Sequence, residues 1–195
     1  WTDPLKLQKQ VDFLEANPNL MIVSHNANIL MGDNLTEGVG ISFNCKIKLK
    51  NMLRYNMMNT VSVVFRNKLS SSDYNILMKY PIGDWPLFCI LLQYGEGLLL
   101  KDFMAVYRIH ENGMWSQKEE IEIINALNRI FEQYKLDFPQ FVKNICAAQK
   151  MLNEDFSEYN NMYNHIQRYK QLNFHNKLLK KLEKVYSSRF FGKKH

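Results

Sequence analysis

The 195-residue chain is 46% apolar and 23% charged, which is typical of a globular protein and excludes a mostly disordered one. Its formal net charge of +6 lies entirely in residues 177–195, because the rest of the chain has equal numbers of basic and acidic side chains. A nucleic-acid role is therefore not expected of the body of the chain. No apolar run approaches the roughly 18 residues of a membrane-spanning helix.

The cysteines favour a reducing compartment. They are odd in number and widely spaced, and none forms a C-x-x-C pair: Cys45, Cys89 and Cys146. This pattern argues against a disulfide scaffold and against a cysteine zinc site. We therefore expect a cytoplasmic protein.

A helix is expected near the N-terminus. Asp3 is a favourable N-cap residue, Pro4 suits the first helical position, and Asn17-Pro18 should end the helix. The residues that recur with a helical period, and so predict its buried face, are Leu7, Val11 and Leu14.

Strand patterns follow the first helix. Residues 20–30 predict a strand, residues 32–34 a turn, and the alternation in residues 39–45 a half-buried strand. After a short helical stretch around residues 46–55, the nearly continuous apolar segment 60–66 predicts a strand in the centre of its sheet.

The middle of the chain continues this alternation of elements. A serine-rich loop is expected at residues 70–73. It is followed by an apolar helix that begins with Trp85-Pro86, runs through Tyr94 and ends at Gly95. Residues 97–107 predict a further strand, and residues 108–116 a polar loop. Alternating helices and strands indicate an α/β fold.

From about Gln117 onward only helical patterns remain. Phe138-Pro139 should separate a first helix from a second at about 140–153, and a third should run from 155 to about 186. The sequence therefore predicts an α/β part, residues 1–117, and an all-helical extension, residues 118–195.

Asp84 is the strongest candidate for chemistry. A carboxylate beside Gly83 on a loop that enters a helix could act as a general base toward a hydroxyl, or it could cap that helix. The neighbouring Trp85 could stack on the face of a sugar or serve only in packing.

His110 is the second candidate, at the point where a strand enters a polar loop. Its imidazole could contact a divalent metal or a phosphate, although an exposed loop histidine often has no such role. Arg66 and Arg108 could neutralise a pyrophosphate or cap the sheet. His25, in the middle of a strand, is interpreted as a core or edge residue. No phosphate-loop, zinc-protease or nucleophile-elbow motif is present in the sequence.

Five segments, in this order, resemble bacterial family 2 glycosyltransferases. They cover roughly residues 1–117 and comprise residues 1–14, His25-Asn26-Ala27, residues 59–67, residues 83–87, and residues 105–110 with Gly113, Trp115 and Ser116. The resemblance implies a GT-A type fold, a nucleotide-sugar donor, a glycan or lipid-linked acceptor, and a divalent cation, Mg²⁺ or Mn²⁺. It also implies direct attack by an acceptor hydroxyl with inversion, as in surface polysaccharide biosynthesis.

The resemblance also assigns roles to single residues. Asp84 matches the family's base, Trp85 a position near the acceptor, and His110 a position that contacts the metal or pyrophosphate. Arg108 is the expected phosphate contact. Gly83 stands where many members have a second acid. The family's donor-binding half, with its Asp-x-Asp metal motif, would precede Trp1, so we expect the chain by itself to be inactive and to leave sheet edges uncovered.

The basic tail supports an alternative from another class of protein. Residues 177–195 mix lysines with leucines and phenylalanines, as in an amphipathic helix that lies on an anionic membrane surface. The chain would then be a noncatalytic interaction module recruited to the inner face of the membrane or to an acidic partner. A solvated, fraying helix end would explain the same pattern.

Overall fold

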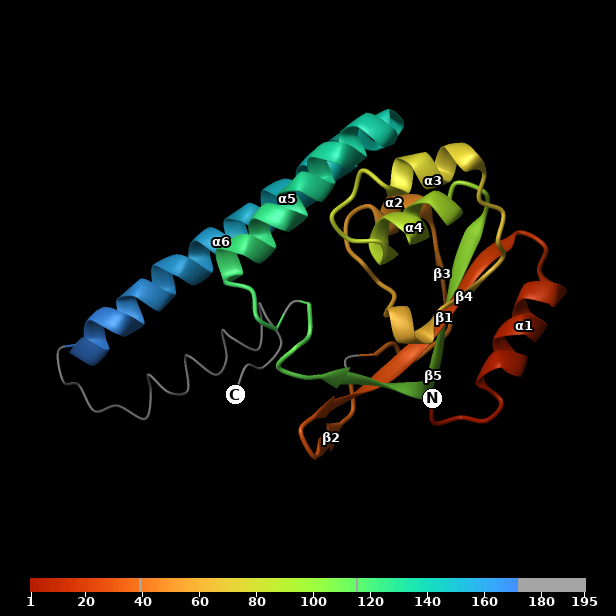
Figure 1. The fold of residues 1–195 in the computed structure, drawn as a ribbon, viewed down its shortest axis with the longest axis horizontal. Helices are drawn as coiled ribbons and strands as arrows, with labels where there is room; N and C mark the ends of the chain where they lie inside the picture. The colour runs from red at the N-terminus through yellow and green to blue at the C-terminus, as the bar shows by residue number, and fades with distance from the viewer. Residues whose placement is uncertain (39, 115, 172–195) are drawn as a thin grey trace. The chain divides into compact units, whose positions relative to one another are not determined.

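The structure is a computed structural model that describes residues 1–38, 40–114 and 116–171 (Figure 1). The chain divides into two compact units, Trp1–Ile145 and Cys146–His195. The elements of the first unit, in chain order, are α1 (Lys6–Ala16), β1 (Leu20–Met31), β2 (Asn34–Thr36), β3 (Cys45–Ile47), α2 (Leu49–Met52), η1 (Thr60–Ser62), β4 (Val64–Phe65), α3 (Ser71–Leu77), α4 (Asp84–Leu91), β5 (Glu96–Ile109), α5 (Glu120–Asp137) and η2 (Pro139–Phe141). The last helix, α6 (Val142–Gln171), spans the boundary between the units.

The centre of the fold is a five-stranded mixed sheet. Its strand order is β2-β1-β5-β3, with β4 also paired to β1. β1 runs parallel to β5 and antiparallel to β2 and β4, while β3 runs antiparallel to β5. In Figure 1, α1 lies on one side of the sheet and α2, α3 and α4 lie on the other. The predicted α/β class, with a mixed sheet flanked by helices and followed by a helical region, is confirmed.

β1 is an internal strand of the sheet, with β5 on one side and β2 and β4 on the other. Its first eight residues are all buried, as expected of a strand with neighbours on each side and helices above and below. Gly32 has a φ of 56°, which an L side chain rarely adopts. It supplies the tight turn that joins β1 to β2, where the expected turn at residues 32–34 lies.

α1 exists as predicted, but with a different face inward. Its buried residues are Lys6, Gln10 and Leu14, whereas Leu7 and Val11 are 45% and 41% exposed. The reason is a hydrogen-bonding demand: the Gln10 Nε2 donates to the Val23 carbonyl at 2.8 Å and to the Ser62 carbonyl at 2.7 Å. Unpaired buried carbonyls are costly, so a polar side chain is retained here in place of an apolar one.

Asp3 lies two residues before the N-cap residue and is not itself the N-cap that the sequence predicts. The helix begins at Lys6 with Leu5 as its N-cap residue, and the Asp3 carboxylate accepts the Leu5 N–H at 2.8 Å. It also forms an ion pair with Lys9 at 2.7 Å. The side chain therefore stabilises the turn that precedes the helix.

The prediction of a central strand at residues 60–66 is wrong. Thr60–Ser62 forms a 3₁₀ turn, and only Val64–Phe65 is extended, at the edge of the sheet against β1. The Ser62 hydroxyl donates to the Asn59 carbonyl at 2.7 Å, and its oxygen lies 2.6 Å from that of Ser24. These side-chain bonds offer the backbone an alternative to the strand ladder.

Residues 39–45 are also not the expected strand, since β3 begins only at Cys45. Within the described part of that segment, the backbone of Ile41 is held by one side chain. The Asn26 amide donates to the Ile41 carbonyl at 2.9 Å and accepts the Ile41 N–H at 3.1 Å. The same amide donates to the Lys101 carbonyl at 2.7 Å, beside an irregularity in the pairing of β1 with β5.

Two further boundaries differ from the sequence prediction. The serine-rich residues 70–73 start a helix, because Ser70 and Asp73 form a reciprocal capping box at the N-terminus of α3. The expected helix at 46–55 is shortened to Leu49–Met52. The predicted strand at 97–107 is confirmed as β5.

The helical region has fewer breaks than expected. α5 ends at Asp137, as the Phe138-Pro139 signal predicts. α6 then continues through residue 154, where two helices were expected, and residues 153–156 contain no glycine or proline that would end it. α5 belongs to the first of the two compact units, which divide after Ile145. The expected division into residues 1–117 and 118–195 stays a prediction. Residues 177–195, which carry the basic tail, lie outside the described residues.

None of the helices in the described ranges is both long and apolar enough to cross a membrane.

Candidate functional site

Asp84 is the first residue of α4, and both of its carboxylate oxygens are held. Oδ2 accepts a hydrogen bond from the Thr60 hydroxyl at 2.7 Å, and Oδ1 lies 2.7 Å from the backbone nitrogen of Trp85, which donates to it. The N-cap residue is Gly83. The alternative in which Asp84 caps this helix is therefore wrong. A carboxylate in the first turn of a helix interacts favourably with the helix dipole. The side chain is thus oriented, and it remains half-exposed.

Trp85 is part of the core. It is 5% exposed, and its indole N–H donates to the Met52 carbonyl at 2.7 Å. Phe131 and Tyr134 of α5 pack against its ring edge to face, each with a centroid distance of 5.7 Å. The structure therefore describes the packing role of Trp85, with no open ring face for a sugar. Its expected contact with an acceptor stays a prediction.

The aromatic cluster joins α5 to the first turn of α4. Tyr134 is fully buried, and burial raises the pKa of its hydroxyl well above the ordinary value. The Cys89 thiol lies 3.5 Å from this hydroxyl, and burial likewise raises the pKa of that thiol. Nearby, the Tyr80 hydroxyl donates to Asp137 at 2.7 Å. These contacts fix the helix that carries Asp84 against the rest of the unit.

Residues 53–59 form a loop, called the 53–59 loop below. The residues on either side of it are hydrogen-bonded to the start of α4. At one end the Met52 carbonyl binds Trp85, and at the other Thr60 binds Asp84. Sequence reasoning missed this arrangement. Thr60 and Asp84 are 24 positions apart, and no local pattern links them.

Arg108 and His110 lie together at the end of β5. Arg108 is near the carboxyl end of the strand, His110 directly follows it, and both are exposed. Within residues 1–38, 40–114 and 116–171, no hydrogen bond or ion pair joins either of them to Asp84. Trp115, which carries part of the family resemblance, is not among the described residues.

The described residues do not by themselves fit a divalent cation. No group of three or more His, Cys, Asp or Glu side chains among them could hold one, and such ions take several oxygen ligands. His110 alone would supply a single nitrogen. The expected Mg²⁺ or Mn²⁺ therefore has no ligand set in this part of the chain.

A buried polar cluster lies under α1 and away from Asp84 in the sequence. Lys6 is 1% exposed; its Nζ donates to Gln10 at 2.8 Å and lies 4.3 Å from the centre of the Trp1 ring. Burial lowers the pKa of Lys6 and, together with the nearby ammonium of Lys6, that of His25. His25 is buried, as its core interpretation predicts. Its Nδ1 lies 2.7 Å from the Asn26 carbonyl, while its Nε2 has no hydrogen-bond partner among the described residues.

The side chain of Arg66 contacts the end of α1, and its expected contact with a pyrophosphate stays a prediction. Its guanidinium donates to the Leu14 carbonyl at 2.5 Å and pairs with Glu15 at 3.1 Å. Both partners lie in the last turns of α1. Arg66, the residue after β4, therefore links that strand to the C-terminal end of α1, where the helix dipole favours a cation.

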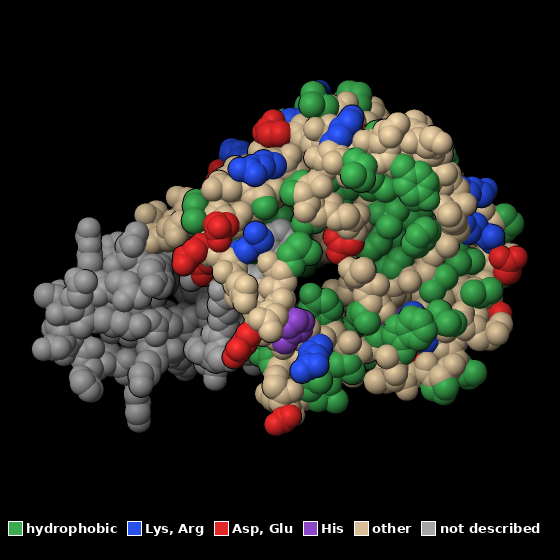
Figure 2. All heavy atoms as spheres, in the orientation of Figure 1, with side chains coloured by type: hydrophobic (Ala, Val, Ile, Leu, Met, Phe, Trp, Pro, Cys, Tyr) green, Lys and Arg blue, Asp and Glu red, His purple; other side chains and the backbone are tan. Residues whose placement is uncertain are grey.

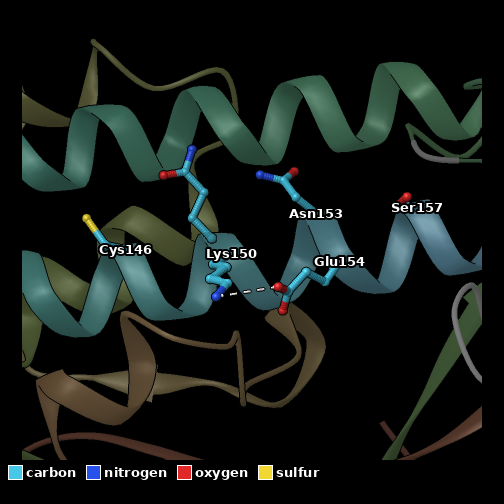
Figure 3. A pocket seen from close by; sticks show the side chains of 6 residues that line it. Cys146, Lys150, Asn153, Glu154 and Ser157 are labelled. Atoms are coloured by element: carbon cyan, nitrogen blue, oxygen red, sulfur yellow. Dashed lines mark ion pairs between the residues drawn. The ribbon is translucent and has the colours of Figure 1, made fainter.

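A shallow pocket on α6 carries little chemistry. All of its lining residues come from one helix, and Figure 3 shows five of them by name: Cys146, Lys150, Asn153, Glu154 and Ser157. Lys150 and Glu154 pair with each other at 3.6 Å across one helical turn. A strip along a single helix does not converge on a ligand as a binding site does.

The charges on the visible face of the molecule are mixed. Figure 2 shows Lys and Arg side chains interspersed with Asp and Glu, and hydrophobic side chains gathered in patches between them. This distribution agrees with the neutral balance of residues 1–176.

The comparisons with known proteins give no activity. No family model matches the chain, and no solved structure matches it. It is similar to Uncharacterized protein Rv1520 of Mycobacterium tuberculosis and to Uncharacterized protein Mb1547 of Mycobacterium bovis, at 35% identity over 119 residues in each case. The match covers 59% of this chain but only 33% of each relative. The chain thus spans about a third of the length of these curated relatives.

Proposed function

We propose that this chain is the acceptor-side part of an inverting glycosyltransferase with a GT-A type fold. The enzyme transfers a sugar from a nucleotide-sugar donor to a hydroxyl of a glycan or lipid-linked acceptor, in surface polysaccharide biosynthesis. The five segments that resemble family 2 enzymes support the class of reaction. The observation that carries the site is the orientation of Asp84 by Thr60 and by the Trp85 N–H.

Asp84 acts as the general base in this proposal. Its carboxylate takes the proton of the acceptor hydroxyl while that oxygen attacks the anomeric carbon. The bond from that carbon to the nucleoside diphosphate breaks, the diphosphate leaves with the electron pair, and the configuration inverts. The hydrogen bonds from Thr60 and from the Trp85 N–H limit rotation of the carboxylate, and each oxygen keeps a further lone pair that can accept the proton.

Binding of the nucleotide and of the divalent cation is assigned to the donor-binding part, which the resemblance places ahead of Trp1. Arg108 and His110 would contact the pyrophosphate from the end of β5. Two exposed groups at the carboxyl end of a strand are well placed for an anionic ligand, because ligands of α/β sheets bind at that edge.

Asp84→Asn tests this function in the protein that contains the chain together with its donor-binding part. Release of nucleoside diphosphate is measured with a panel of UDP-, GDP- and dTDP-sugars. Loss of the base should lower kcat by about 10²–10⁴-fold, since the amide cannot accept the proton. Asp33→Asn, in the exposed turn after β1, is the matched control and should leave kcat unchanged. Turnover of Asp84→Asn at the wild-type rate, or no turnover of any donor by the wild type, would contradict the proposal.

A further inference from the structure

We propose that the 53–59 loop binds the acceptor as an oligosaccharide, with Tyr55 as the aromatic surface on which one of its sugar rings stacks. The inference rests on the proposed function and deepens it, since it names the kind of acceptor and the side chain that selects it. It also transfers the stacking role from Trp85, which is buried, to an exposed residue on the loop that Trp85 holds.

Tyr55 is exposed and has no structural role in the described part of the chain. Its side chain is 72% exposed, and no hydrogen bond or ring contact involves its hydroxyl or its ring. Removal of an aromatic ring from water is favourable, so a ligand that covers the Tyr55 ring gains binding energy. The apolar C–H face of a pyranose can cover such a ring while its hydroxyls stay solvated, and the phenol group suits this mixed environment.

Arg54 adds hydrogen-bond donors beside the ring. It is exposed, and its side chain takes part in none of the ion pairs or hydrogen bonds of the described residues. A planar guanidinium presents five N–H donors in a fixed arrangement, which fits neighbouring sugar hydroxyls. Arg54 and Tyr55 together therefore offer the stacking surface and the polar contacts that a carbohydrate needs.

Along the chain, Tyr55 lies close to both hydrogen bonds that join the loop to α4. Tyr55 lies three residues beyond Met52 and five before Thr60, and these two residues bind Trp85 and Asp84 respectively. Five extended residues span at most about 17 Å. This stretch is more compact than an extended chain, because the Met58 N–H donates to the Asn56 side chain at 3.3 Å.

The acceptor is expected to extend beyond the reacting sugar. A chain of two or three sugars reaches from Asp84 to the loop, with the reacting sugar at Asp84 and the next sugar on Tyr55. Both anchors of the loop are on the first two residues of α4, so the platform and the base are held as one unit.

The direct test is sugar binding by the purified protein that contains the chain together with its donor-binding part. Saturation-transfer NMR is recorded with maltose, cellobiose, lactose and chitobiose as probes. At least one disaccharide should bind the wild type, and Tyr55→Ala should weaken that binding roughly tenfold, the loss of one aromatic contact. Tyr55→Trp should retain binding, and Tyr74→Ala, at a tyrosine 50% exposed on α3, should leave it unchanged. Binding that is equal in the wild type and Tyr55→Ala, or no binding of any of the four probes, would overturn the inference.

Failure of the site and failure of the transferase assignment give different results. Asp84→Asn should keep disaccharide binding while it abolishes turnover, since the base is not needed to hold the sugar. Disaccharide binding through Tyr55 in a protein that turns over no nucleotide sugar would overturn the transferase and leave a sugar-binding loop. Turnover with an unchanged acceptor KM in Tyr55→Ala would overturn the loop and leave the transferase.

Discussion

Trp85→Phe tests whether the core around α4 depends on the indole N–H. In the wild type this group donates to the Met52 carbonyl at 2.7 Å, and Met52 is fully buried. Phenylalanine keeps an aromatic ring but has no donor. The Met52 carbonyl would then be left without its partner and without water to replace it.

The expected loss of stability follows from these contacts. An unpaired buried carbonyl costs about 2 kcal/mol. The smaller ring gives up part of the edge-to-face packing with Phe131 and Tyr134, which adds about 1 kcal/mol. A total of about 3 kcal/mol corresponds to a fall in Tm of about 6–12 °C for a chain of this length.

The assay is thermal unfolding followed by far-UV circular dichroism, because removal of a tryptophan alters the fluorescence itself. Trp1→Phe is the matched control. Trp1 is 71% exposed, so the same change of side chain there should alter the free energy of unfolding by only about 0.5 kcal/mol. If Trp85→Phe shifts Tm no more than Trp1→Phe does, the indole hydrogen bond does not stabilise the core and the reasoning fails.

Two further changes probe the sheet. Gly95→Ala should destabilise the protein by about 1–3 kcal/mol, because its Cβ would lie within 2.3 Å of the Asn19 carbonyl oxygen; Gly83→Ala, with nothing within 4 Å of the added atom, should unfold like the wild type in urea. His25 should make stability depend on pH. Burial lowers the pKa of His25 in the folded state, so its contribution is complete above the ordinary value of about 6.5 and is lost as pH falls below that value toward the lowered pKa. Urea midpoints between pH 7.5 and 5 should fall less steeply in His25→Gln than in the wild type, while His110→Gln, at an exposed residue, keeps the wild-type slope; a wild-type slope in His25→Gln would refute the assignment.

The elements that the sequence predicts well are those with long, uninterrupted patterns. β1 and β5 appear where expected because each is a long stretch rich in strand-forming apolar residues, and α5 because it keeps a helical period and ends before Phe138-Pro139. The errors arise where a single polar side chain satisfies the backbone of a distant segment. Gln10 turns α1 away from its apolar stripe to reach two carbonyls, and Asn26 replaces a strand ladder at Ile41. Such bonds join positions that a local pattern does not connect.

The sequence predicts that Gly95 ends the helix that begins near Asp84, but the structure gives it another role. The last helical residue of α4 is Leu91, with Leu92 as the C-cap residue, so Gly95 does not terminate the helix. It lies instead where the chain enters β5 and passes close to the Asn19 carbonyl, which also accepts the Glu96 N–H at 2.9 Å. The sequence signal for a special residue was right, but its cause is close backbone approach.

The same distinction applies to the candidate site. The sequence singles out Asp84 and Trp85 as neighbours, and a local pattern can do so because they are adjacent. It cannot reveal that these two residues hold opposite ends of the 53–59 loop, since Met52 and Thr60 come from a different segment. If the indole N–H of Trp85 fixes that loop, Trp85→Phe should weaken disaccharide binding at Tyr55 as well as lower Tm. A variant that loses stability but binds the disaccharide as tightly as the wild type would show that the Trp85–Met52 hydrogen bond does not position the loop. The hydrogen bond between Thr60 and Asp84 would then be the contact that positions it.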